Sequence, residues 1–224
     1  MSTARATAII LAKELRLEFR TRELLSATIV FALVVEVLFS FAFDPSPADA
    51  RRIGPGLLWI AFLFAGSLML NPSFAREQAN DTLDGLRLAP ISSFSILFGK
   101  LLANLVFMLL AELVLVPVFG VLYNVAIFGI AGRLALVLLL GTLGLVITGT
   151  VFSAISAQAR MRELLLPLLL LPVLAPLLIA AVEATASLFL DDPVIDRTWV
   201  TFLAGFDIVF MTAAWLLCDY LVAE

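Results

Sequence analysis

Long apolar stretches alternate with short polar breaks along almost the whole of this sequence. Six stretches exceed about 17 residues, the lower limit for a helix that crosses roughly 30 Å of hydrocarbon. They lie near residues 24–43, 54–72, 100–122, 133–157, 163–185 and 199–222. The pattern predicts an all-α integral membrane protein, in which residues 1–224 form a single transmembrane domain of six helices.

The composition of the chain agrees with a lipid environment. Of its 224 residues, 62% are hydrophobic and 14% are charged, and the mean hydropathy is +1.11. A soluble domain of this size needs a larger polar surface. The net charge of −4 gives no support to nucleic-acid binding. Cys218 is the only cysteine and histidine is absent, which excludes an intrachain disulfide, covalent haem attachment and Cys/His metal sites.

The basic residues are distributed unevenly between the breaks. If the N-terminus is cytoplasmic, most of them lie on the cytoplasmic side, namely Arg5, Lys13, Arg16, Arg20, Arg22, Arg76, Arg87, Lys100, Arg160 and Arg162. The outer side then holds only Arg51, Arg52, Arg133 and Arg197. The positive-inside rule therefore predicts that both termini are cytoplasmic.

The segment before the first apolar run is amphipathic. Between residues 7 and 23, one helical face carries Ala8, Leu11, Ala12, Leu15 and Phe19, and basic side chains lie elsewhere on the wheel. Such a segment is typical of a helix that lies in the membrane interface, although a cytosolic extension of the first span is an alternative. Because charges precede the apolar run, we expect no cleavable signal.

The break at residues 73–99 is the only one long enough to hold structure of its own. It contains charged residues together with Leu83, Leu86 and Leu88, followed by Pro90. This mixture favours a short cytoplasmic amphipathic helix after the second span, which docks into a cleft of a soluble partner. The alternative is that the leucines rest on the membrane surface.

Part of this break resembles a known family pattern. Residues 80–86 read Asn-Asp-Thr-Leu-Asp-Gly-Leu, and Pro90 follows. They resemble the acid-Gly-[Ser/Thr]-Leu-Glu-x-Leu-x-x-x-Pro pattern that follows the second helix of type-2 ABC exporter permeases. Three positions depart from that pattern, because Asn80 and Asp81 replace the acid-Gly pair and Asp84 replaces the usual Glu.

Other segments narrow the resemblance to the B-subunit permease of the haem exporter in cytochrome c maturation. They are residues 52–59, which read Arg-Ile-Gly-Pro-Gly-Leu-Leu-Trp, the Gly141-Thr142 pair, and residues 171–179, which read Leu-Pro-Val-Leu-Ala-Pro-Leu-Leu-Ile. The match follows the whole chain in order and in length. The resemblance implies a permease that lies in the inner membrane of a bacterium. This permease couples ATP hydrolysis to haem export for periplasmic cytochrome c maturation.

The same resemblance implies a set of partners. These are an ABC ATPase A-subunit pair, a haem-handling C-subunit, a small membrane D-subunit and, indirectly, a periplasmic haem chaperone. Haem is then a transported substrate, and no cofactor is bound covalently. Six spans are half of the twelve usual for an ABC exporter core, so we expect the chain to pair with itself or with a related subunit.

The chain lacks the phosphate-binding motif G-x-x-x-x-G-K-[ST], because Leu101 follows Gly99-Lys100 and Phe94 occupies the position of the first glycine. We therefore expect no enzymatic activity, and ATP binds only to a partner. The expected docking residues for that ATPase are Arg76, Glu77, Asp81, Thr82, Leu83, Asp84, Leu86 and Pro90.

Residues inside or beside the spans are candidates for a substrate pathway or a subunit interface. They are Arg51, Arg52, Pro55, Trp59, Glu112, Pro172 and Pro176. Glu112 lies halfway along its span, where a carboxylate is costly unless it has a function or is a neutral, hydrogen-bonded acid. The prolines of the fifth run predict a bent helix. Arg51, Arg52 and Trp59 are expected at the outer mouth, where they suit either haem or lipid headgroups.

Other functions are compatible with the same residues. The cargo of the permease is alternatively lipid, polysaccharide or a drug. A second alternative is a membrane scaffold that transports nothing and relays ATPase motion to a haem-handling partner. An intramembrane enzyme is disfavoured, because the sequence contains no Ser/His pair, metal-ligand cluster or H-E-x-x-H motif.

Overall fold

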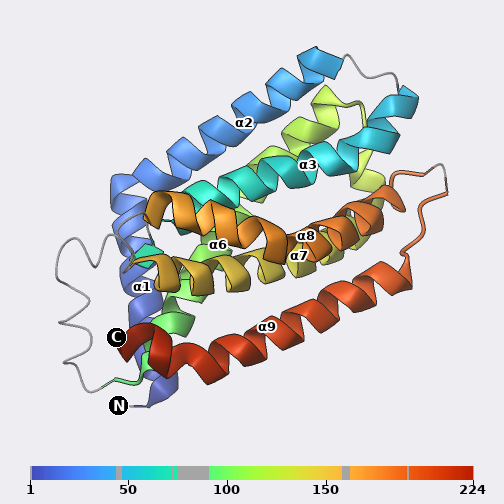
Figure 1. Ribbon diagram of the computed structural model, residues 1–224. Coiled ribbons are helices and arrows are strands. Elements are labelled where there is room, and N and C mark those ends of the chain that lie inside the picture. Colours follow the sequence, from blue (N-terminus) through green and yellow to red (C-terminus); the bar gives the residue numbers. More distant parts are fainter. Residues whose placement is uncertain are drawn as a thin grey trace.

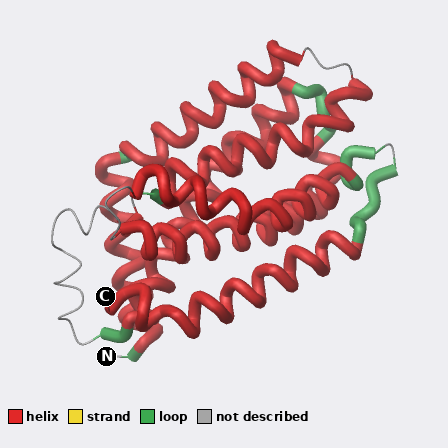
Figure 2. Tube along the Cα trace, viewed as in Figure 1, coloured by secondary structure: helices red, strands yellow, loops and turns green. Residues whose placement is uncertain are grey.

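The computed structural model describes residues 2–43, 47–71, 73–74, 91–157, 162–190 and 192–223. Every long element in these ranges is a helix, as Figure 2 shows. The helices are α1 (Thr3–Thr21), α2 (Glu23–Phe43), α3 (Pro47–Leu70), α6 (Ser93–Leu122), α7 (Ile127–Ala157), α8 (Arg162–Ala186) and α9 (Arg197–Ala223). The prediction of an all-α protein is confirmed.

Five of these helices are long and apolar enough to span a membrane. They are α2, residues 51–70 of α3, α6, residues 127–156 of α7 and residues 197–221 of α9. Residues 170–186 of α8 form a shorter apolar stretch. Each helix overlaps one of the predicted runs, so the apolar pattern located these helices correctly along the chain.

Several helices begin earlier than their apolar runs, among them α3, α6 and α7. Helix α6 begins at Ser93 rather than near residue 100, because Ser92 accepts a hydrogen bond from the Ser95 N–H and caps the helix. Helix α7 begins at Ile127 rather than near residue 133, and it includes Gly132 and Arg133. Both of these residues are exposed, so they continue the helix without entering the core.

The long helices lie side by side and run up and down, whereas α1 runs across one end of the bundle (Figure 1). Both chain termini lie at this end. The opposite end gathers the connections between α6 and α7 and between α8 and α9. There the Arg133 guanidinium donates to the carbonyl oxygen of Pro193, and the Tyr123 hydroxyl donates to the carbonyl oxygen of Glu36 at 3.2 Å.

Helix α1 differs from the predicted helix in its bounds and in the face that it buries. It starts four residues before the predicted position 7 and ends two before position 23. Its most buried residues are Ala6, Ile10 and Glu18, whereas Ala8 and Phe19 are exposed. The face that contacts the bundle is thus rotated from the apolar face read from the sequence.

The corner between α1 and α2 is held by Glu18. Its carboxylate accepts a hydrogen bond from the Leu25 N–H at 2.7 Å, and its backbone carbonyl accepts one from Arg22 N–H at 2.6 Å. Arg22 adopts a left-handed conformation with φ of 55°, which ends α1. The first turn of α2 therefore has an acceptor for one of its backbone donors, and the direction of α1 is fixed.

Candidate functional site

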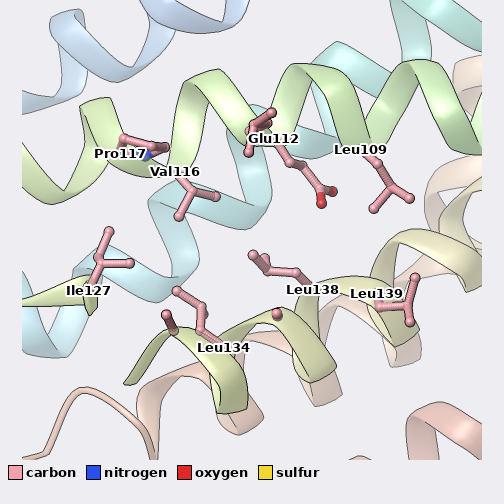
Figure 3. Close-up of a pocket in the computed structure, with 11 residues that line it drawn as sticks. Leu109, Glu112, Val116, Pro117, Ile127, Leu134, Leu138 and Leu139 are labelled. Atoms are coloured by element: carbon pink, nitrogen blue, oxygen red, sulfur yellow. The ribbon is translucent and has the colours of Figure 1, made fainter. Parts of the chain in front are cut away.

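Glu112 lines a cavity between two helices. The space between α6 and α7 has a volume of about 270 Å³ and is otherwise lined by apolar side chains. Figure 3 shows that Glu112 extends from α6 toward this space. Only 4% of the residue is exposed, and its carboxyl group accepts a hydrogen bond from the Thr142 hydroxyl of α7. Glu112 therefore lies at a helix–helix contact with a polar partner.

Trp59 occupies the interior of the bundle rather than its outer mouth. The residue is 1% exposed, and its Nε1 donates to the Thr185 hydroxyl of α8 at 2.9 Å. The indole also lies against Gly141 of α7, where an added Cβ would be 2.2 Å from the ring. The expectation that Trp59 faces the outer surface is wrong, because the ring fills the space that Gly141 leaves open between three helices.

Arg51 and Arg52, eight and seven residues before Trp59, lie near the start of α3 at one end of the bundle. Arg51 and Arg52 are both exposed, and Arg51 lines a cavity of about 380 Å³ together with Tyr123, Phe189 and Pro193. Pro55 is buried inside α3. The cavity has mixed polar and apolar walls, so this end of the protein contains both a cation and aromatic surface.

The remaining candidates divide into exposed residues and residues outside the described ranges. Pro172 and Pro176 are exposed on α8, which is continuous from Arg162 to Ala186. Residues 75–90 are outside the described ranges and include every candidate of the ATPase-docking loop, namely Arg76, Glu77, Asp81, Thr82, Leu83, Asp84, Leu86 and Pro90.

A second polar site lies at the opposite end from Arg51, around Lys100 of α6. The ammonium group donates to Glu14 Oε1 of α1 at 3.0 Å and to the Ser73 carbonyl oxygen at 2.7 Å. It also lies 5.0 Å from the centroid of the Phe74 ring, within reach of a cation–π interaction. Only 1% of the Lys100 side chain is exposed. A buried charge of this kind is tolerated because its donors are satisfied from several directions.

Asn104, one helical turn after Lys100, extends the same site into α7. Its side-chain nitrogen donates to the Ser73 hydroxyl at 3.1 Å and to the Thr150 hydroxyl at 3.0 Å. Ser73 is thus bonded twice, through its backbone by Lys100 and through its side chain by Asn104. This arrangement joins α1, α6, α7 and Ser73 in one hydrogen-bonded group.

The surroundings of Glu14 favour the ionised form of its carboxyl group. Burial raises the pKa of the Glu14 carboxyl, but attraction to Lys100 and Lys13, with the hydrogen bonds they donate, outweighs burial. The pKa therefore lies below its ordinary value of 4.5. Lys13 lies 3.2 Å from the same oxygen but is 43% exposed, so Lys100 is the better shielded partner.

The Lys100 site was not predicted from the sequence, although the sequence contains a signal for it. Lys100, Asn104 and Glu112 are separated by four and eight residues, so they share one face of α6. A polar stripe on an otherwise apolar helix marks the side that faces other helices. Glu14 and Thr150 had no such signal, because their pairing depends on tertiary contacts.

Two further buried carboxylates lie within the spans. Glu36 of α2 is 2% exposed and Asp207 of α9 is 6% exposed, and within the described residues neither carboxylate has a hydrogen-bond partner. Asp207 lies against Gly144 of α7, where an added Cβ would be 2.7 Å from its oxygen. The described ranges contain no group of three or more acidic, Cys or His residues arranged to hold a metal ion.

Comparisons with known proteins agree with the resemblance seen in the sequence. A family model described as CcmB protein matches residues 5–217. The chain is 33% identical over 174 residues to heme exporter protein B of Rhodobacter capsulatus, which covers 78% of this chain and 79% of the relative. It is 33% identical over 171 residues to the protein of the same name from Pseudomonas aeruginosa, covering 76% of each chain. For the Paracoccus denitrificans protein, identity is 34% over 175 residues, covering 78% and 80%.

Proposed function

Because this chain belongs to the CcmB protein family, we propose that it is the membrane permease subunit of a haem-export complex for cytochrome c maturation. The main support for the proposal is the length of this chain that the family model matches. The family model covers residues 5–217, which include the described helices long and apolar enough to cross a membrane except the last residues of α9. In this proposal haem is the substrate of the complex, and this chain binds no cofactor covalently.

The membrane topology that we propose has six spans with both termini in the cytoplasm. Helix α8 is the sixth span, because its 25 residues at about 1.5 Å rise extend roughly 37 Å, which exceeds the hydrocarbon thickness. Helix α1 lies in the cytoplasmic interface, a position supported by its orientation across the end of the bundle (Figure 1). The excess of basic residues on this side supports the same orientation.

Hydrolysis of ATP takes place in a partner subunit, which docks on the segment after α3. Support comes from the family pattern at residues 80–90 and from the position of the flanking residues. Ser73 contacts Lys100, and Ser95 donates to the Thr3 carbonyl oxygen of α1 at 3.3 Å. Both flanks of the segment are therefore close to α1, on the side that we assign to the cytoplasm.

The complete complex contains further subunits. We assign an ATPase A-subunit pair, a haem-handling C-subunit and a small membrane D-subunit, with release of haem to a periplasmic chaperone. A second copy of this chain supplies the remaining spans of the export core. Support for the second copy comes from the count of spans, since an ABC exporter core usually has twice as many.

The experiment that tests this function is purification of the chain co-expressed with its genomic neighbours. The Leu83→Asp/Leu86→Asp variant places charges on the proposed docking surface, and Leu83→Met/Leu86→Met is the matched control that keeps it apolar. We expect an ATPase to co-purify with the wild type and the Met variant and to be lost from the Asp variant. Failure to recover an ATPase with the wild type contradicts the function, whereas retention by the Asp variant contradicts only the docking site.

A further inference from the structure

Helix α1 packs closely on the first turns of α6 at Gly99 and Lys100. An added Cβ at Gly99 would be 2.7 Å from Ile10 Cβ and 3.2 Å from the carbonyl oxygen of Thr7. Glycine at this position thus allows the two helices to approach closely. Beside this contact, the Glu14–Lys100 ion pair at 3.0 Å fixes the register of α1 on α6.

The second hydrogen bond of Lys100 is made to a residue outside α1. Its ammonium group donates to the Ser73 carbonyl oxygen, and Phe74 covers the group from another direction. Residues 73 and 74 are the last described residues before the segment that we assign to ATPase docking. Lysine suits this position because its ammonium group has three donors that point in different directions and no acceptor.

A third connection links Ser73 to α7 through Asn104. Asn104 donates to the Ser73 hydroxyl and to Thr150, so a displacement of Ser73 changes contacts on both α6 and α7. Thr150 is fully buried. Hydrogen-bonded groups in such surroundings have few alternative partners, and a displacement of one is passed to the next.

We propose that Lys100 is a positioning residue that joins α1 and residues 73–74 into one mechanical unit, through which movement of the bound ATPase reaches α6 and α7. The inference rests on the proposed function and adds the residue that transmits the movement. Lys100 contacts neither ATP nor haem in this scheme. It acts by holding the Ser73 backbone and the Glu14 carboxylate at the same time.

The test uses the complete complex and measures three quantities for each variant. These are the amount of ATPase that co-purifies, the yield of cytochrome c with attached haem per ATP hydrolysed, and the hydrogen–deuterium exchange of α1. The yield per ATP reports coupling, and the exchange reports whether α1 is docked. A residue that only stabilises the fold lowers the amount of complex without changing the yield per ATP.

Lys100→Met keeps a long side chain but removes all three donors. We expect the ATPase to be retained, the yield per ATP to fall about tenfold, and exchange in α1 to rise, because a buried charge-assisted bond is lost on each side. The matched control is Lys13→Met, which removes the exposed partner of the same carboxylate. The control is expected to match the wild type in all three measurements.

The exchanged pair Glu14→Lys/Lys100→Glu separates the two bonds of Lys100. It restores an ion pair between α1 and α6, but a glutamate at position 100 cannot donate to the Ser73 carbonyl oxygen. We expect exchange in α1 to return toward the wild-type level while the yield per ATP stays low. This result also supports the proposal if Lys100→Met alone does not assemble.

Two results overturn the proposal. One is a wild-type yield per ATP in Lys100→Met, and the other is full recovery of the yield in the exchanged pair, which assigns Lys100 to α1 docking alone. Failure of the proposed function gives a different result, because the wild-type complex then contains no ATPase activity or produces no haem-loaded cytochrome. The two failures are therefore distinguishable in the same set of measurements.

Discussion

Gly141→Ala is predicted to destabilise the bundle through a single clash with Trp59. An alanine Cβ at this position would lie 2.2 Å from the far edge of the indole and within 2.9 Å of two more ring atoms. The ring cannot easily turn away, because its Nε1 is bonded to Thr185 and its surroundings are buried. Either α3 and α7 separate or the indole loses its hydrogen bond.

The expected cost is that of an overpacked core, about 1–3 kcal/mol in the free energy of unfolding. For a chain of this length, each kcal/mol lowers the melting temperature by about 2–4 °C, as a guide taken from soluble proteins. The matched control is Gly132→Ala on the same helix, where an added Cβ meets nothing within 4 Å. This control is expected to be neutral or stabilising by up to about 1 kcal/mol, because alanine favours the helix.

A double-mutant cycle identifies the clash as the cause. In a Trp59→Leu background the ring is gone, so Gly141→Ala is expected to lose most of its cost. Thermal unfolding of the four purified proteins in one detergent provides the comparison. A clash with Trp59 is ruled out if Gly141→Ala is as stable as Gly132→Ala, or if the cost of Gly141→Ala is unchanged when the ring is absent.

Three more perturbations test other contacts. Thr142→Val is expected to lower the free energy of unfolding by about 1–3 kcal/mol, because buried Glu112 loses its donor; equal stability of Thr142→Ser and Thr142→Val contradicts this. Glu14 has a lowered pKa in the folded state, so its pairing with Lys100 stabilises α1 docking above about pH 4.5 and is lost as pH falls through the folded pKa. Hydrogen exchange in α1, corrected for intrinsic rates, should therefore rise on acidification in the wild type but not in Glu14→Gln. Glu18→Ala is expected to cost about 0.5–2 kcal/mol in chemical unfolding, because the first turn of α2 loses its cap; an unchanged midpoint argues against the cap.

The helical membrane fold was predictable because lipid imposes a simple rule on sequence. A spanning segment must be apolar for about 20 residues and must satisfy its backbone internally, so apolar runs locate the helices directly. Helix ends were less predictable. Gly132 and Arg133 interrupt an apolar run without interrupting α7, because exposed polar residues are compatible with a helix that extends beyond the lipid.

The candidate site was predictable only where one residue carries its own signal. Glu112 is conspicuous in an apolar run, and it does meet a polar partner across a helix contact. Trp59 was misplaced because an aromatic residue near a helix end is equally suited to the membrane surface and to the core. Trp59 lies in the core because Gly141 and Thr185 create a pocket for its indole. These two residues lie 82 and 126 positions after Trp59 along the chain.

Deletion of the gene, followed by measurement of haem attached covalently to exported c-type cytochromes, shows whether this chain is the permease subunit of a haem exporter. We expect attachment to be lost while the apocytochromes are still exported, and we expect the wild-type chain to restore it but the Leu83→Asp/Leu86→Asp variant not to do so. Normal amounts of haem-loaded c-type cytochromes in the deletion strain would show that the chain has another function.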